Sequence, residues 1–567
     1  MSLLTAIVST GSKSSVSDKG SRVKLLGLGI VLLAFLLRMF QLGHQQLWLD
    51  EAISFHFASL HGGFDEMLRL ENNPPLYYVL LHFWLPIAGN SEAAVRFPSA
   101  VAGTLAVLAI IWAGWQIFTP AAGLWAGAFA AVAPIHVYYS QEARVYVILT
   151  LELALAYGLL WRAMRLNTRT AWMLVSLAAL TALYSHYFAI IGLVPALFIL
   201  WVWPQDLQSR SRQQRFLAAS LTCAALYTPW LMWAFLLTPR SGIVDWTDLW
   251  KATPPAMAIP RSLELFSLGP QRDLMMIHMK QFAWLKLPDP MRWAGLVILC
   301  GLAVWVAGAW QESRLNIPWL GRRKAWVASL IAMPLMLLWL ISLYRPVYVP
   351  GRYDQVAFVG YALMVGLALA KLQAVKQYGH AIVMVAALGL VIPVGTKLVL
   401  YYKAPADRES EATARAVHLL IANGDAVVFN AIRGIPILGY YLPKLDYEWK
   451  DGTCRSVLRT REFTCRMFPP EMESTFLPPS MQTQEQLRTA VEAFLKPMTM
   501  VHNHLWLVLF DGMIRDDVLS ASRPEDLALV AELVRGGYQP ESTHFNDVPA
   551  LYRFRRYTPG IALNQRG

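Results

Sequence analysis

The first long apolar run, VKLLGLGIVLLAFLLRMFQL (Val23 to Leu42), is followed within a few residues by the acidic segment WLDEAIS (Trp48 to Ser54). A run of about 20 apolar residues is long enough to cross a bilayer as a helix. The acidic pair Asp50 and Glu51 therefore emerges at the far membrane surface, where Trp48 is suited to the headgroup region. Two carboxylates held at such an interface point to chemistry on lipid-bound material.

The composition places the whole chain in the same class. Its 567 residues are 56% hydrophobic and only 15% charged, far less charge than a soluble protein of this length carries. The net charge is +12, but the basic residues stand in short groups between apolar runs. This pattern is typical of membrane topology and argues against a nucleic acid partner. We expect a polytopic α-helical membrane protein.

Windows of about twenty apolar residues predict eleven transmembrane helices. Lysine and arginine gather on alternate connections, so the positive-inside rule places the N-terminus in the cytoplasm and the acidic pair outside it. The predicted spans lie near residues 23–42, 96–118, 121–139, 144–163, 171–188, 189–203, 216–237, 292–310, 325–344, 353–371 and 380–401.

Three regions follow from this pattern. Residues 1–22 are polar and Ser-rich, and we expect a disordered cytoplasmic tail there. Residues 23–401 are predicted to form a transmembrane domain with two large outer loops, 43–95 and 238–291. In the first loop, Leu76 to Trp84 continues for about nine apolar residues, too few to span, and predicts a helix lying along the interface.

The third region, residues 402–567, is polar and predicts a small α/β domain outside the cytoplasm. An oxidising compartment would allow Cys454 and Cys465 in this domain to form a disulfide. The predicted elements are a helix at Asp407–Ala422, strands at Asp425–Asn430 and Leu505–Phe510, a helix at Pro524–Arg535 and a strand at Leu551–Phe554.

Five motifs stand in the order in which bacterial membrane glycosyltransferases carry them. They are WLDEAIS, NNPPLYYVLLHFW from Asn72, SEAAVRFPSAVAG from Ser91, YSQEARVYV from Tyr139 and YSHYFA from Tyr184, with a looser match at the GRY around Arg352. The chain resembles the family of the protein O-mannosyltransferases and the lipid A aminoarabinose transferases, which have the integral-membrane GT-C fold. NNPPLYY departs from the lysine-bearing loop of the aminoarabinose transferases, which argues against lipid A as the acceptor.

The resemblance implies an enzyme of the bacterial cytoplasmic membrane that works at the periplasmic face. It would move one sugar from a polyprenyl-phosphate donor to a lipid, glycan or protein acceptor, with inversion at the anomeric carbon. The acidic residue of the first loop acts on the acceptor in such enzymes, and this maps onto Asp50, with Glu51 beside it. A carboxylate within hydrogen-bond distance can accept the proton of an attacking hydroxyl. The alternative is that the pair caps the following helix.

The donor side calls for cations, because a departing polyprenyl phosphate is negatively charged. Arginine can meet phosphate with two hydrogen bonds and stays charged at any relevant pH. We expect Arg96, Arg144 and Arg352 in this role, since each lies at the outer end of a predicted span. Ordinary interfacial snorkelling is the alternative for each of them, and Arg38 fits that alternative better.

Other polar and aromatic residues in these motifs are candidates for substrate contacts or for support of the arginines. Local ion pairs and packed histidines are the alternatives. The candidates are Glu92, Glu142, Tyr77, His82, Tyr139, His186 and Tyr353.

No CxxC, HExxH or Gly-rich phosphate loop is present in the sequence. Nucleotide and zinc chemistry therefore has no support, and we expect no required cofactor, with a divalent cation left open. Two alternatives to the transferase remain. One is a lipid-linked sugar flippase or transporter, although such proteins generally carry ionisable residues inside their spans or show internal repeats. The other is a GT-C enzyme that transfers or ligates a whole oligosaccharide.

Overall fold

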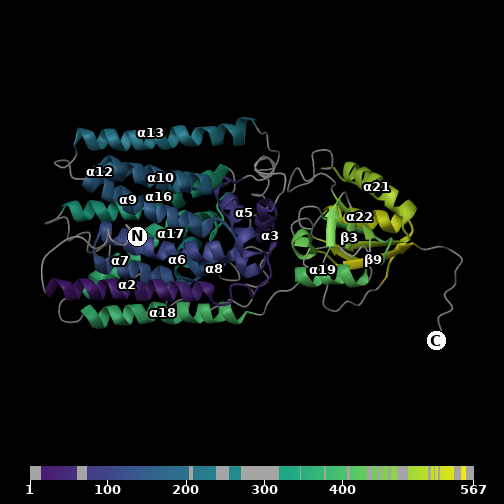
Figure 1. Ribbon diagram of the computed structural model, residues 1–567, viewed down its shortest axis with the longest axis horizontal. Helices are drawn as coiled ribbons and strands as arrows, with labels where there is room; N and C mark the ends of the chain where they lie inside the picture. Colours follow the sequence, from purple (N-terminus) through teal and green to yellow (C-terminus); the bar gives the residue numbers. More distant parts are fainter. Residues whose placement is uncertain are drawn as a thin grey trace. The chain divides into compact units, whose positions relative to one another are not determined.

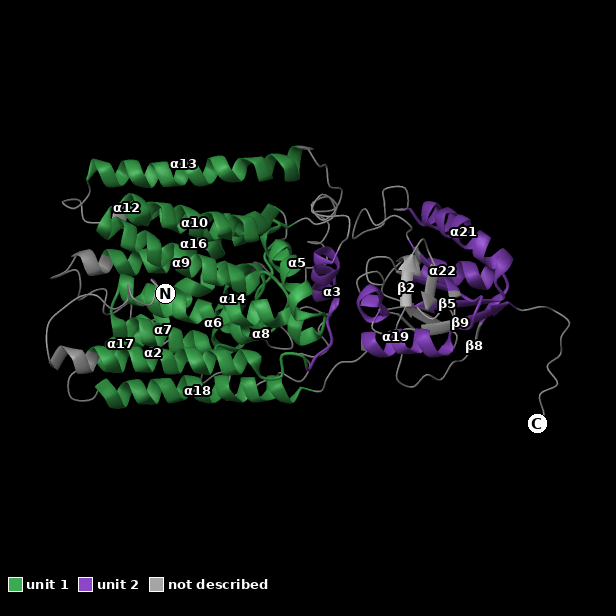
Figure 2. Cartoon of the chain, in the orientation of Figure 1, with its two compact units in different colours: residues 1–43, 71–239, 247–405 green, residues 44–70, 240–246, 406–567 purple. Residues whose placement is uncertain are grey.

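The computed structural model divides the chain into two compact units (Figures 1 and 2). The first comprises residues 1–43, 71–239 and 247–405, and the second comprises residues 44–70, 240–246 and 406–567. The structure describes residues 15–59, 73–202, 209–237, 255–269, 318–344, 347–375, 379–404, 409–430, 437–443, 447–450, 453–456, 462–468, 483–508, 512–515, 518–521, 524–541 and 551–556.

The first unit is helical, and its long helices run side by side in Figure 1. Several begin at a Ser or Thr whose side chain accepts a hydrogen bond from a free backbone N–H of the first turn, as Ser91 does from Ala94 N at 3.2 Å. The helices are α2 (Ser15–Met39), α5 (Leu76–Ala88), α6 (Glu92–Ile117), α7 (Pro120–Val132), α8 (Pro134–Ser140), α9 (Tyr146–Leu166), α10 (Arg169–Ser185), α11 (Ala189–Leu193), η1 (Val194–Phe198), α12 (Ile199–Val202), α13 (Arg210–Met232), η3 (Trp233–Leu237), α14 (Pro255–Leu268), α16 (Pro318–Tyr344), η6 (Tyr353–Ala357), α17 (Phe358–Gln373) and α18 (Gly379–Lys403).

Among the described residues, 7 helices are long and apolar enough to cross a membrane, or up to 8 if α7 and α8, which meet at 64°, form one bent span. They correspond to predicted spans 23–42, 96–118, 121–139, 144–163, 216–237, 325–344, 353–371 and 380–401. The protein is thus a multi-span helical protein, as expected.

The full count of eleven spans stays a prediction. The segment 171–188 corresponds to α10, which has 17 residues, and 189–203 forms the three short pieces α11, η1 and α12. The predicted span 292–310 lies outside the described residues. So does the predicted outer loop 238–291, apart from residues 255–269, which contain α14. Helix α2 begins at Ser15, within the predicted tail 1–22, and the disorder of that tail stays a prediction.

The interior of the first unit is formed by α6, α7, α9 and α17, which contact one another. Small residues allow this close approach. A Cβ atom added at Gly114 of α6 would lie 2.7 Å from the Cα of Gly123 in α7, so no larger side chain fits at that crossing. Membrane helices commonly pack in this way, because lipid provides no hydrophobic driving force and close contact replaces it.

Arg38 is fully buried, so the snorkelling expected of it is wrong. Its guanidinium donates to the carbonyls of Ala131 at 3.0 Å and Ala130 at 3.2 Å. These carbonyls lie where α7 ends. Pro134 has no N–H to donate to Ala130 four residues earlier, so the bend leaves acceptors that need another partner. Arg38 supplies it from a neighbouring helix.

The second unit contains a seven-stranded mixed sheet in the order β2-β3-β4-β1-β5-β9-β8. Strand β1 is parallel to β4 and β5, and the other neighbours are antiparallel. The elements are α3 (Leu49–Ala58), α19 (Glu409–Leu420), β1 (Ala426–Asn430), β2 (Tyr447–Lys450), β3 (Thr453–Ser456), β4 (Glu462–Phe468), α21 (Gln484–Val501), β5 (His504–Val508), β6 (Gly512–Arg515), β7 (Val518–Ala521), α22 (Pro524–Arg535), β8 (Tyr538–Glu541) and β9 (Leu551–Arg556).

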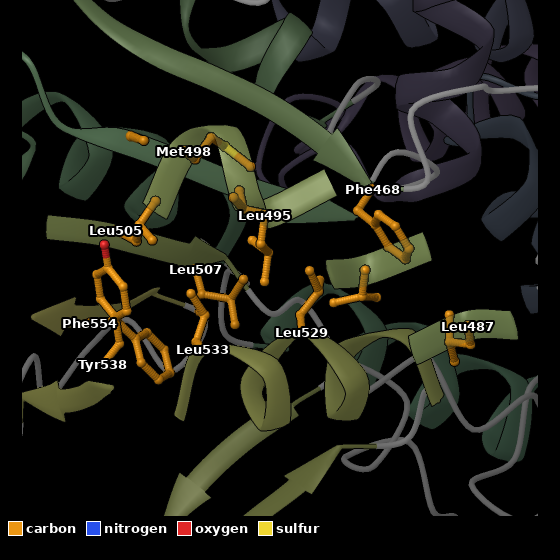
Figure 3. Close-up of a cluster of buried hydrophobic side chains, with 13 residues drawn as sticks. Phe468, Leu487, Leu495, Met498, Leu505, Leu507, Leu529, Leu533, Tyr538 and Phe554 are labelled. Carbon is orange, nitrogen blue, oxygen red and sulfur yellow. The ribbon is translucent and has the colours of Figure 1, made fainter. Parts of the chain in front are cut away.

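The core of this unit lies where α21 and α22 meet the sheet (Figure 3). Leu487, Leu495 and Met498 of α21 and Leu529 and Leu533 of α22 are buried at helical spacing. They pack with apolar residues of the strands, among them Leu505, Leu507 and Phe554. Elements α19, β1, β5, α22 and β9 lie where the sequence predicts them. Strands β2, β3, β4 and β8 and helix α21 were not predicted.

The disulfide stays a prediction. Cys465 is buried in β4, whereas the side chain of Cys454 in β3 lies outside the described residues. The antiparallel register pairs Cys454 with Phe463, two positions before Cys465. The two cysteines thus occupy diagonal positions on the same face of the sheet.

Candidate functional site

Residues from three distant segments converge on Tyr146, which begins α9. Nε of Arg352 donates a 2.5 Å hydrogen bond to the Tyr146 hydroxyl, and its guanidinium carbon lies 5.6 Å from the centre of that ring. The guanidinium carbon of Arg144 lies 6.0 Å from the same centre. Both arginines are nearly enclosed, with exposed fractions of 8% for Arg144 and 9% for Arg352. The structure thus brings two predicted donor-side arginines to one ring.

Aromatic side chains continue the cluster. The rings of Tyr139 and His186 lie 4.9 Å and 5.8 Å from that of Tyr146, measured between centres. Tyr353 lies 5.9 Å from His186 and faces the Arg352 guanidinium at 5.6 Å. Tyr139, His186 and Tyr353, predicted as separate candidates, are therefore parts of one site. We call Tyr139, Arg144, Tyr146, His186, Arg352 and Tyr353 the Tyr146 cluster.

The loop before Arg352 is held in one conformation. Gly351 has a φ of 82°, which glycine adopts without the strain that a Cβ would bring. Its N–H donates to Oδ2 of the buried Asp354 at 2.9 Å, and its carbonyl accepts a hydrogen bond from the Tyr139 hydroxyl. The glycine of GRY thus places Arg352 against Tyr146, with Asp354 and Tyr139 fixing the turn.

Two guanidinium groups and a set of hydroxyls in an enclosed site suit an anion with several acceptor oxygens. Arginine binds phosphate with paired hydrogen bonds, and such bonds strengthen where water is excluded. This arrangement is suited to recognition of a phosphate group.

Arg96 and two of the predicted carboxylates have local contacts. Arg96 is buried and donates to the carbonyl of Leu42 at 3.1 Å, which ties α6 to the chain beyond α2. Glu92 lies in the first turn of α6, where a negative charge interacts favourably with the positive end of the helix dipole. Glu142 is buried and accepts a hydrogen bond from the Tyr138 hydroxyl. The Glu142 carbonyl also accepts from the Arg144 N–H at 2.8 Å, which links Glu142 to the Tyr146 cluster through the backbone.

Tyr77 and His82 lie on α5, whose 13 residues are too few to span, as predicted. Tyr77 is buried and His82 partly buried. Trp84 anchors the helix to α6, since its indole N–H donates to the Ala94 carbonyl at 2.8 Å and its ring stacks on Phe97.

The acidic pair lies in the first turn of α3, which belongs to the second unit. Asp50 and Glu51 are both buried. Glu51 Oε2 accepts from the Trp48 backbone N–H at 3.3 Å, so Glu51 caps the helix, the alternative considered for the pair. Burial lowers the pKa of His56 on the same helix below its usual range.

Sequence reasoning missed the centre of the cluster. Tyr146 was part of a quoted motif, but its position two residues after Arg144 gave no reason to single it out. Asp354 was missed as well, although an acid directly after GRY signals a local turn. Within the described part of the chain, no group of three or more His, Cys, Asp or Glu residues is placed to hold a metal ion.

Comparisons with known proteins found a matching family model and similar solved structures. Residues 72–233 match the family model described as dolichyl-phosphate-mannose-protein mannosyltransferase. The matched range includes Arg96, Arg144 and His186, and lies between the acidic helix α3 and Arg352. No match was found among curated proteins.

The structure is similar to that of ArnT from Cupriavidus metallidurans in the apo state, with a TM-score of 0.55 and 13% sequence identity over 93% of this chain and 97% of that one. The structure of the same protein bound to undecaprenyl phosphate gives a TM-score of 0.52 and 12% identity over 94% and 97% of the two chains. The fold is thus that of ArnT, and the resemblance to GT-C glycosyltransferases is confirmed.

Proposed function

We propose that this chain is a glycosyltransferase that takes a sugar from a polyprenyl-phosphate donor. It passes the sugar to a lipid, glycan or protein acceptor at the outer face of the bacterial cytoplasmic membrane. The observation that carries the proposal is the meeting of Arg144 and Arg352 at the Tyr146 ring. Two enclosed arginines at one ring fit a lipid phosphate better than they fit a neutral ligand.

The donor chemistry follows from these charges. When the bond between the anomeric carbon and the phosphate oxygen breaks, negative charge grows on the departing polyprenyl phosphate. Guanidinium groups already in place stabilise that charge without reorganising, which lowers the barrier. Arg352 is held for this task by the Tyr146 hydroxyl.

On the acceptor side, we assign the base to Asp50. The acceptor hydroxyl loses its proton to the Asp50 carboxylate as its oxygen forms a bond to the anomeric carbon from the face opposite the phosphate. A single displacement of this kind inverts the anomeric configuration. Glu51 is assigned a different duty, because its carboxylate already accepts the hydrogen bond of the Trp48 N–H.

The comparisons support the donor class. The matching family model names a sugar carried on a lipid phosphate, and the fold is one in which ArnT has been seen with undecaprenyl phosphate. A flippase for lipid-linked sugars would also bind such a molecule. The assay below separates the two, because a flippase moves the donor across the bilayer without breaking its sugar–phosphate bond.

The test uses the full-length protein in proteoliposomes with a radiolabelled polyprenyl-phosphate sugar and extracted cell-envelope material as a mixed acceptor. We expect label to move from the prenyl lipid into the acceptor fraction while polyprenyl phosphate is released. The same sugar supplied as a nucleotide sugar should give no product. Transfer from the nucleotide sugar alone, or movement of intact donor across the bilayer without cleavage, would contradict the proposal.

A further inference from the structure

The acidic segment is joined to the C-terminal part of the chain by contacts within the second unit. Residues 44–70 group with residues 406–567, although α2 precedes them and α5 follows them in the chain, as the colouring of α3 in Figure 2 shows. Helix α3, which carries the assigned base, therefore groups with residues far from it in the sequence. Gln46 and Ser410, which are hydrogen-bonded, are 364 positions apart.

Hydrogen bonds and a ring contact join residues 44–59 to the C-terminal part of the chain. Oε1 of the buried Gln46 accepts from the N–H of Ser410 at 2.8 Å, in the first turn of α19, where backbone donors have no partner within the helix. The N–H of Leu47 donates to the Tyr441 hydroxyl at 2.9 Å. The ring of Phe55 meets that of Tyr440 edge to face, with centres 4.8 Å apart.

These contacts lie on both sides of Asp50. Gln46 and Leu47 hold the chain directly before α3, and Phe55 holds the helix one turn after the acid. Each contact is made by a buried group, since Tyr440 and Tyr441 are nearly inaccessible to solvent. A helix fixed at both ends has little freedom to rotate or slide, so the contacts set where the Asp50 backbone lies.

We propose that residues 406–567 position the catalytic acid Asp50. Tyr441 and Gln46, which join these residues to the chain before α3, are the positioning residues. This inference rests on the proposed function, in which Asp50 is the base. Residues 406–567 then have a part in the reaction, because they determine how accurately the carboxylate meets the acceptor hydroxyl. Misplacement of a base by a small distance lowers the turnover rate and leaves donor binding intact.

The test compares Tyr441→Phe with Tyr538→Phe. Both substitutions remove one buried hydroxyl from the second unit, but Tyr538 donates to the carbonyls of Thr499 and His502, within the C-terminal part alone. We expect Tyr441→Phe to lower kcat about tenfold with an unchanged donor KM, because the Leu47 N–H is left without its acceptor. Tyr538→Phe should leave kcat unchanged.

A double-mutant cycle distinguishes positioning from general loss of structure. In an Asp50→Asn background, Tyr441→Phe should cause no further loss of the residual activity, because the group that it positions is already gone. A further tenfold loss in that background would overturn the proposal. If Tyr441→Phe does not fold, Gln46→Leu, which removes the acceptor for Ser410 N–H at similar volume, takes its place in the same cycle.

Hydrogen exchange provides a readout that does not need activity. Amides of residues 44–59 should exchange faster in Tyr441→Phe than in wild type and stay protected in Tyr538→Phe. Unchanged exchange there would overturn the inference even if transfer is observed. If wild type shows no transfer but the exchange difference appears, the junction is real and the proposed function is the part that fails.

Discussion

Nε of Arg352 donates a 2.5 Å hydrogen bond to the hydroxyl of Tyr146, a residue 206 positions earlier in the chain. The bond joins the loop before α17 to the start of α9. It also orients the guanidinium across the Tyr146 ring, which Arg144 approaches as well. We regard this pair as the centre of the donor site.

Tyr146→Phe removes the acceptor of the Arg352 hydrogen bond and keeps the ring. A bond to a charged group is typically worth about 1.5 to 3 kcal/mol, so we expect polyprenyl phosphate to bind about 10- to 100-fold more weakly. Tyr157→Phe is the matched control, because Tyr157 lies on the same helix and its buried hydroxyl donates to the Gly192 carbonyl at 2.6 Å. Equal effects of the two substitutions on lipid binding would argue against a special role for Tyr146.

Asp50 and Glu51 should separate in their effects. Asp50→Asn preserves volume and removes the proton acceptor, so we expect transfer to fall about 10²- to 10⁴-fold with normal thermal stability. Glu51→Ala removes the acceptor for Trp48 N–H and should lower stability by about 1 kcal/mol. Glu51→Gln, which keeps an acceptor oxygen, should restore most of that stability. Turnover near that of wild type in purified Asp50→Asn would refute the assignment of the base.

Arg38→Met should destabilise the protein strongly. The substitution leaves the carbonyls of Ala130 and Ala131, next to the bend at Pro134, without the hydrogen bonds that Arg38 donates. Each buried carbonyl left without a donor lowers the free energy of unfolding by about 1 to 3 kcal/mol. Arg165→Met is the control, since Arg165 is exposed and bonded to Gln116. Thermal unfolding in detergent should show a much larger drop in Tm for Arg38→Met. Equal drops would mean that the buried guanidinium is dispensable.

The membrane orientation is predicted from the basic connections between spans. We expect the N-terminus in the cytoplasm and residues 402–567 in the periplasm. Reporter fusions at Lys19 and after Lys403 distinguish the two sides. A reporter after Lys403 that is active in the cytoplasm would contradict this orientation.

Sequence patterns predicted the helices and strands that depend on neighbouring residues in the chain. Long apolar runs such as that of α18, and the helix Pro524–Arg535, follow from residue type and spacing alone. The segment 189–203 was read as one span because its composition is apolar, but Pro195 lies in its middle and the chain forms three short pieces there. Short strands such as β2 carry too few residues for a clear alternation.

The convergence of residues in the site depends on tertiary contacts, which local patterns do not contain. Motif order named Arg144, His186 and Arg352, but only the folded chain shows that they meet at Tyr146. Arg96 was named by the same reasoning, and its described hydrogen bond goes to the Leu42 carbonyl. The position of an arginine at the outer end of a predicted span therefore makes it a candidate for the donor site. That position alone does not show which of the candidates lie close to one another. No local sequence pattern indicates that α3 groups with residues 406–567.

Binding of polyprenyl phosphate to wild type, Arg352→Lys, Arg352→Ala and the control Arg169→Ala in lipid nanodiscs tests the central claim most directly. Arg169 is exposed at the start of α10, so its loss should leave binding unchanged. Lysine keeps the charge of Arg352 and loses the two-pronged contact, so affinity should fall from wild type through Arg352→Lys to Arg352→Ala. Equal affinity in all four proteins would contradict the account.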